Sequence, residues 1–172
     1  FRRLVQREPM GRSAQTRPRR NLSRPRDRLT KNTTTTTSPM ELVIFDLETT
    51  GFSPRTHEII QIAAVRMRHG ELVAGERFAT FVRPRNEIPS FISDLTGITR
   101  ADLRDALDPA PALLAFSRFV GDATLVAHNG WRFDLGFIRA GCQRHQLPMR
   151  AVPFFDSMTL SRQLWGNTES HS

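Results

Sequence analysis

The chain has 172 residues, of which 38% are apolar and 24% charged, and its formal net charge is +8. This length is sufficient for one domain with a buried core. Residues 1–40 carry a charge of about +9 and the remainder about −1, so the later part is not a basic nucleic-acid clamp by composition. The single cysteine excludes a disulfide and a cysteine zinc site within the chain.

Residues 1–39 are rich in Arg, Pro, Ser and Thr and show no apolar periodicity, so we expect a disordered tail. Three interpretations compete: a basic arm that contacts nucleic acid, an organelle presequence, or translated sequence upstream of a true start at Met40. We favour the third, because the chain opens with Phe1 and Met40 directly precedes the first predicted strand. No apolar run is long enough for a membrane span or a secretory signal, and we therefore expect a cytoplasmic location.

An apolar run over residues 42–45 predicts a strand that is covered on both faces. Asp46 and Glu48 follow two residues apart, so a strand places both carboxylates on one face. Such a pair favours a divalent cation with oxygen ligands, Mg²⁺ or Mn²⁺. The alternative is an exposed strand end whose acids are solvated or paired with arginine. The tight polar turn at residues 49–51 favours the metal site.

The chain between residues 58 and 120 predicts two more strands and two helices. Residues 58–68 and 71–82 are rich in β-branched residues and predict strands, joined at His69-Gly70 by a two-residue hairpin. Residues 99–102 are typical of the capped start of a short helix, and residues 111–120 predict a longer one.

The remaining predicted elements are a strand at 124–127, a turn at 128–130, a helix to about Gln146, a strand at 152–155 and a last helix that Asp156 or Ser157 caps and that ends near Gly166. Three hairpin-connected strands followed by β-α alternation indicate an α/β fold with a mixed sheet flanked by helices. Cys142 lies in the third predicted helix, and we expect a buried, free thiol in a reducing compartment.

Asp134 lies about one turn into the helix that follows the 124–127 strand. An isolated aspartate near a helix N-terminus is usually favoured by the helix dipole alone. Together with Asp46 and Glu48, however, it supplies a third carboxylate from a second strand end. The three acids therefore favour a metal site over an aspartate that only interacts with the helix dipole.

These motifs resemble the DEDD superfamily of 3′-to-5′ exonucleases, and within it the DnaQ-like group that contains the proofreading epsilon subunit of bacterial DNA polymerase III and ribonuclease T. Residues 46–51 match the first exonuclease motif, and His128-Asn129 with Phe133-Asp134 match the second. Residues 96–99 and 155–157 are also similar to family landmarks. The resemblance implies a ribonuclease H-like exonuclease domain over residues 40–172.

The resemblance also implies hydrolysis of DNA 3′ ends to nucleoside 5′-monophosphates with two divalent ions about 4 Å apart. Asp46 would bridge the ions, Glu48 would hold the ion on the nucleophile side and Asp134 the other ion. The residues implied to contact the terminal nucleotide are Leu47, Thr49, Thr50, Ile98, Asn129 and Phe133. The implied partners are a single-stranded 3′ end and a DNA polymerase subunit, with no membrane.

The family completes its site with a third motif, a histidine general base followed by a fourth carboxylate, and the 172 residues contain no match to it. His171 is interpreted as the start of the family's next helix rather than as this base. We therefore expect a C-terminally incomplete domain with little activity as given. Two alternatives stay open: a non-catalytic module that binds nucleic acid or a polymerase, and an exoribonuclease.

Overall fold

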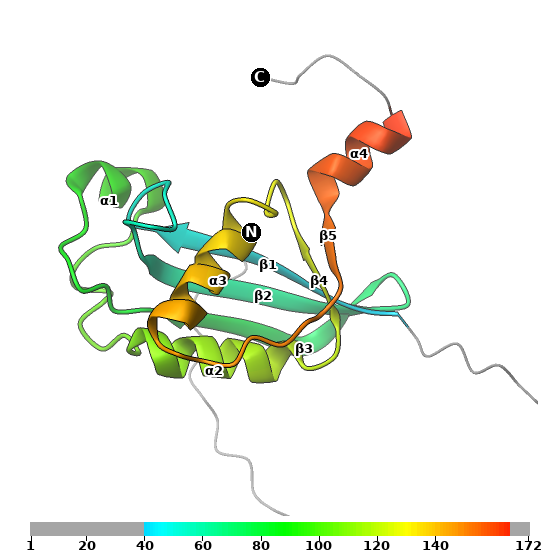
Figure 1. Cartoon of the computed structure of the whole chain (residues 1–172), viewed down its shortest axis with the longest axis horizontal. Helices are drawn as coiled ribbons and strands as arrows, with labels where there is room; N and C mark the ends of the chain where they lie inside the picture. Colours follow the sequence, from blue (N-terminus) through cyan, green and yellow to red (C-terminus); the bar gives the residue numbers. More distant parts are fainter. Residues whose placement is uncertain (1–39, 166–172) are drawn as a thin grey trace, which may run out of the picture. The chain divides into compact units, whose positions relative to one another are not determined.

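The computed structural model describes residues 40–165 (Figure 1). Strands β1 (Glu41–Thr49), β2 (Ile59–Arg68) and β3 (Glu71–Phe81) are antiparallel, and β4 (Thr124–Ala127) and β5 (Phe154–Asp156) continue the sheet in parallel from β1. The order across this five-stranded sheet is β3-β2-β1-β4-β5. The predicted α/β class with a mixed sheet is confirmed.

Strand β1 is longer than its apolar run predicts, and it includes both acids rather than ending before them. Val43, Phe45 and Leu47 are buried on one face of the strand, whereas Asp46 between the last two is exposed and Glu48 is partly buried. This alternation follows from the period of two in a strand, and it places the two carboxylates on the face opposite the main core.

The hairpin between β2 and β3 turns at His69 and Gly70, as predicted. Their φ angles are 53° and 83°. Positive φ at both central residues gives a turn whose twist matches that of the paired strands, and glycine adopts it without strain.

Helices α2 (Pro109–Val120) and α3 (Asp134–Arg144) lie across one side of the sheet (Figure 1). The main core cluster joins them to β1 and β2, with the rings of Phe45 and Phe116 5.3 Å apart and Phe137 1% exposed. Gly121 ends α2 with a φ of 59°, as expected of a glycine just past a helix.

A second, smaller cluster forms near the start of β2, where Ile60 packs against helix α1 (Ser90–Thr96). We did not predict α1, which begins after Pro89 without a side-chain cap. The helix predicted from residues 99–102 is wrong: Thr99 and Asp102 do exchange hydrogen bonds, yet residues 100–105 form only turns. The chain cannot continue as a helix there because Leu107 pairs with the end of β3.

Helix α4 (Ser157–Trp165) follows β5 and buries no residue within the described part of the chain. Its predicted end near Gly166, the predicted tail and His171 lie outside the described residues. Strand β5 is shorter than the predicted 152–155 strand and shifted toward Asp156. No helix within residues 40–165 is long and apolar enough to cross a membrane.

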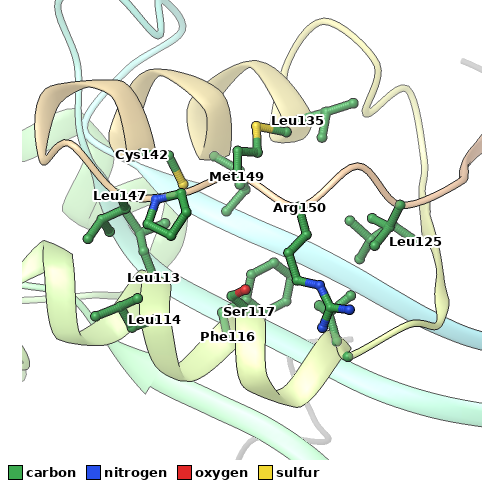
Figure 2. Close-up of a pocket in the computed structure, with 15 residues that line it drawn as sticks. Leu113, Leu114, Phe116, Ser117, Leu125, Leu135, Cys142, Leu147, Met149 and Arg150 are labelled. Carbon is green, nitrogen blue, oxygen red and sulfur yellow. The ribbon is translucent and has the colours of Figure 1, made fainter.

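Cys142 is buried in α3 and free, as predicted, and it lines an apolar cavity of about 50 Å³ between α2, α3 and residues 147–152 (Figure 2). Burial raises the pKa of the thiol. Pockets that enclose a ligand usually have several hundred Å³ and a few polar groups. The lining of this cavity contains no carboxylate or imidazole, the groups that hydrolytic and metal sites most often use.

Candidate functional site

The structure ties Asp134 to the strand that carries the other two acids. The backbone N–H of Leu47, which lies between Asp46 and Glu48, donates a 3.2 Å hydrogen bond to Asp134 Oδ1. Asp134 is the first residue of α3 and is only 4% exposed. We predicted it one turn into the helix; residues 128–133 form a non-helical loop instead.

The surroundings of the Asp134 carboxylate disfavour its ionised form. Burial, and next the charge of Asp46, raise its pKa to about 7, although the bond from Leu47 opposes the rise. The charge of Asp46 contributes to the raised pKa, and the Leu47 N–H bond ties Asp134 to the strand that carries Asp46. The structure therefore brings together the acids that two distant motifs predicted.

Within residues 40–165, no three His, Cys, Asp or Glu side chains form a ready-made metal cluster. The donor set nevertheless fits a divalent cation, because a buried carboxylate repelled by a second one is stabilised by positive charge and both offer hard oxygen atoms. Glu48 extends from the same face of β1 as Asp46.

The turn that follows β1 is fixed by its own hydroxyl groups. Thr49 Oγ1 donates to the carbonyl of Gly51 at 2.7 Å, and Thr50 Oγ1 accepts from the N–H of Glu58 at 3.0 Å. Both threonines are buried. A Cβ at Gly51 would lie 2.3 Å from the ring of His57, so this turn packs closely on itself.

The other residues predicted to contact a nucleotide lie in different surroundings. The side chains of Leu47 and Ile98 are buried in the main and the second core cluster. Phe133 packs edge-on against Phe137 with ring centroids 5.0 Å apart, and only Asn129 of the set is exposed. Any contact with a ligand at Leu47 and Ile98 is consequently through the backbone.

Asp156 connects the loop before Asp134 to the start of α4. Its Oδ1 accepts the N–H groups of Asn129 (3.1 Å) and Met158 (3.0 Å), and its Oδ2 accepts that of Trp131 (3.1 Å). Burial alone would raise the pKa of Asp156, but these backbone donors, with that of Thr159, hold it below the ordinary value. From the sequence we predicted the helix cap and missed the bonds to the loop, because no local pattern signals them.

Trp131 was also missed by the sequence analysis. The residue is 54% exposed, its ring centroid lies 5.6 Å from that of Phe154, and the Arg139 guanidinium lies 5.2 Å from the Trp131 centroid. An exposed aromatic ring next to a cation suits contact with nucleobases and phosphates.

Comparison with known proteins places this site in a family. A profile described as "Exonuclease" matches residues 43–172. The chain belongs to the exonuclease family. It is 41% identical over 129 residues to a DNA polymerase III PolC-type of Streptococcus pyogenes serotype M2 (strain MGAS10270), covering 75% of this chain and 9% of that protein. A PolC-type polymerase of Latilactobacillus sakei subsp. sakei (strain 23K) is 41% identical over 131 residues, covering 76% and 9%.

Solved structures of exonuclease I share the fold of this exonuclease-family chain. A product-bound form superposes with a TM-score of 0.66 at 19% identity, covering 74% of this chain and 32% of that one. The Escherichia coli enzyme in complex with a dT13 oligonucleotide gives 0.66 at 19% identity, covering 74% and 30%. The predicted resemblance to 3′-to-5′ exonucleases and the ribonuclease H-like fold are confirmed, and the family is metal-dependent.

Proposed function

We propose that the chain is a 3′-to-5′ exonuclease domain that removes nucleoside 5′-monophosphates from DNA 3′ ends, in proofreading or repair. The observation that carries the proposal is the hydrogen bond from the Leu47 N–H to Asp134, which ties the second acidic motif to the strand that carries the first. The PolC-type relatives and the exonuclease I complex with dT13 support DNA as the substrate and a polymerase as the partner. The chain spans about a tenth of those relatives, and its cytoplasmic location stays a prediction.

Asp46, Glu48 and Asp134 would hold two Mg²⁺ or Mn²⁺ ions. Bound there, the ions would supply an activated water and would neutralise charge at the leaving 3′ oxygen. The protein's own contribution is to fix these carboxylates: β1 presents the first two on one face, and the Leu47 N–H holds the third against that strand.

The terminal nucleotide would lie over the turn at Thr49 and Thr50 and along Asn129 and Phe133, with backbone contacts at the two positions whose side chains are buried, Leu47 and Ile98. Trp131 would stack on a base and Arg139 would face the strand's phosphates. Contacts of this kind recognise a strand end and stacked bases rather than a sequence.

A labelled oligonucleotide tests the proposal. With Mg²⁺ or Mn²⁺, the protein extended by any gene sequence past Ser172 should shorten a 5′-labelled single strand in single-nucleotide steps. In it Asp46→Ala should lower the rate at least about a thousandfold, since both ions lose a ligand. Asp122→Ala is the matched control, because Asp122 is exposed and pairs with Arg150 away from the acids. Undiminished shortening by Asp46→Ala would refute the proposal.

The general base sets the level of activity to expect. Such a base contributes about 10²- to 10⁴-fold, and the histidines of residues 40–165 supply no counterpart to the family's third motif. If gene sequence follows Ser172, the extended protein should therefore exceed the 172-residue chain by about this factor. Equal rates would show that the third motif is dispensable.

The second candidate function is a non-catalytic module that binds nucleic acid or a polymerase. Metal-dependent binding of the oligonucleotide by the extended protein, without release of nucleotides, would support this candidate. Competition between matched RNA and DNA strands separates an exoribonuclease from a deoxyribonuclease.

A further inference from the structure

Asp156, 22 residues after Asp134 in the sequence, accepts hydrogen bonds from the loop that precedes Asp134. Asn129 and Trp131, the residues on either side of Gly130, each donate their backbone N–H to one oxygen of the Asp156 carboxylate, both at 3.1 Å. The Asp156 carboxylate therefore binds the loop at two points. This bidentate arrangement fixes position and orientation together.

The turn at residues 129–131 leads directly to Asp134. The carbonyl of Gly130 accepts the N–H of Leu135 at 2.9 Å, which starts α3. A Cβ at Gly130 would lie 3.0 Å from Asp134 Oδ2 and 2.3 Å from the Cβ of Ala127, so the turn packs tightly beneath the catalytic carboxylate. Asn129 has a φ of 55°, in the left-handed region that asparagine adopts more readily than most residues, which suits it to this turn.

We propose that Asp156 is a positioning residue of the nuclease site, which fixes the turn at residues 129–131 and through it the place of Asp134 against β1. The proposal rests on the proposed function. Helix capping alone accounts for the bonds to Met158 and Thr159, at 3.0 and 3.4 Å, but not for the two bonds to the loop.

Two substitutions separate capping from positioning. Asp156→Ser retains a hydroxyl that caps α4, but its shorter side chain does not reach Asn129 and Trp131. Asp156→Asn retains the reach and one acceptor, while its amide N–H groups face the Trp131 donor. Asp102→Ser is the matched control, because Asp102 also accepts a backbone N–H, from Thr99 at 2.9 Å, beside the second core cluster.

Amide hydrogen exchange, Mn²⁺ affinity and kcat are measured on each variant. In Asp156→Ser the amides of Asn129 and Trp131 should exchange about 10- to 100-fold faster, the range expected for lost hydrogen bonds to a charged acceptor. Those of Met158 and Thr159 should change less. Mn²⁺ affinity and kcat should each fall at least tenfold, and Asp102→Ser should leave all of them unchanged.

Faster exchange confined to Met158 and Thr159, with unchanged Mn²⁺ affinity, would overturn the proposal and leave a helix cap. If Asp156→Ser does not fold, Asp156→Asn decides: faster exchange at Trp131 with weaker Mn²⁺ binding supports positioning, and unchanged Mn²⁺ binding overturns it. An extended wild-type protein that binds Mn²⁺ but releases no nucleotide would refute the proposed function alone, because exchange and Mn²⁺ affinity still report on Asp156.

Discussion

Replacing Asp134 by asparagine should stabilise the protein at neutral pH while removing its response to metal. The carboxylate is buried, and burial with the charge of Asp46 raises its pKa to about 7 from an ordinary value of 3.8. A raised pKa means that the folded state binds the proton more tightly than the unfolded state. The ionised form consequently destabilises the fold, progressively from about pH 4 to pH 7.

The magnitude follows from the shift of about three pKa units, which corresponds to about 4 kcal/mol at pH 8. Asparagine has no charge and can retain the Leu47 N–H bond through Oδ1. Part of the gain is offset because its buried amide needs partners of its own. We expect Asp134→Asn to raise the free energy of unfolding by about 2–4 kcal/mol at pH 8 and by less than about 1 kcal/mol at pH 5.

Urea denaturation with a chelator present, at pH 5 and pH 8, measures this difference. Adding Mg²⁺ or Mn²⁺ at pH 8 should stabilise the wild type, by about 2.7 kcal/mol at a hundred times Kd, and the variant much less. Asp122→Asn serves as the control, since Asp122 is 92% exposed. A variant that is no more stable than the wild type at pH 8, or equally more stable at both pH values, would refute the raised pKa of Asp134.

Gly130→Ala should cost about 1–3 kcal/mol in urea denaturation and weaken Mn²⁺ binding, because its Cβ would lie 2.3 Å from that of Ala127; Gly136→Ala, with a 3.2 Å approach to Pro54 Cγ, should cost less. Burial and the raised pKa of Cys142 should make it react with a thiol reagent at least about tenfold more slowly than free cysteine until urea unfolds the protein; equal rates would contradict its burial. Deleting residues 1–39 should change neither the melting temperature nor the salt dependence of DNA binding, whereas a shallower salt slope would show that the tail contacts phosphates.

The sequence was sufficient for the features that depend on local periodicity. Strand alternation predicted that Asp46 and Glu48 share a face, and glycine chemistry predicted the hairpin at His69-Gly70, whose φ angles are both positive. Helix α2 was found from its apolar spacing and from Gly121 at its end. In these places one physical preference acts over a few neighbouring residues.

The errors lie where distant contacts decide the backbone. The loop at residues 128–133 was predicted to enter a helix early, but Asp156 holds it away from helical geometry. The bonds between Thr99 and Asp102 were expected to start a helix, but Leu107 is drawn to β3. Helix α1 has neither a side-chain cap nor more than one buried residue, so its sequence carries little signal.

The hydrogen bond between Leu47 and Asp134 joins residues 87 positions apart, and this separation bears on when the site forms. Strands β2 and β3 are joined by a two-residue turn and β1 and β2 by residues 50–58, so these three strands can pair early, because local contacts close small loops. Strand β4 must then add to β1 in parallel across the intervening chain, a slower step. A nascent chain that has paired these three strands would therefore carry Asp46 and Glu48 on one face of β1 before β4 and α3 bring Asp134 to that strand.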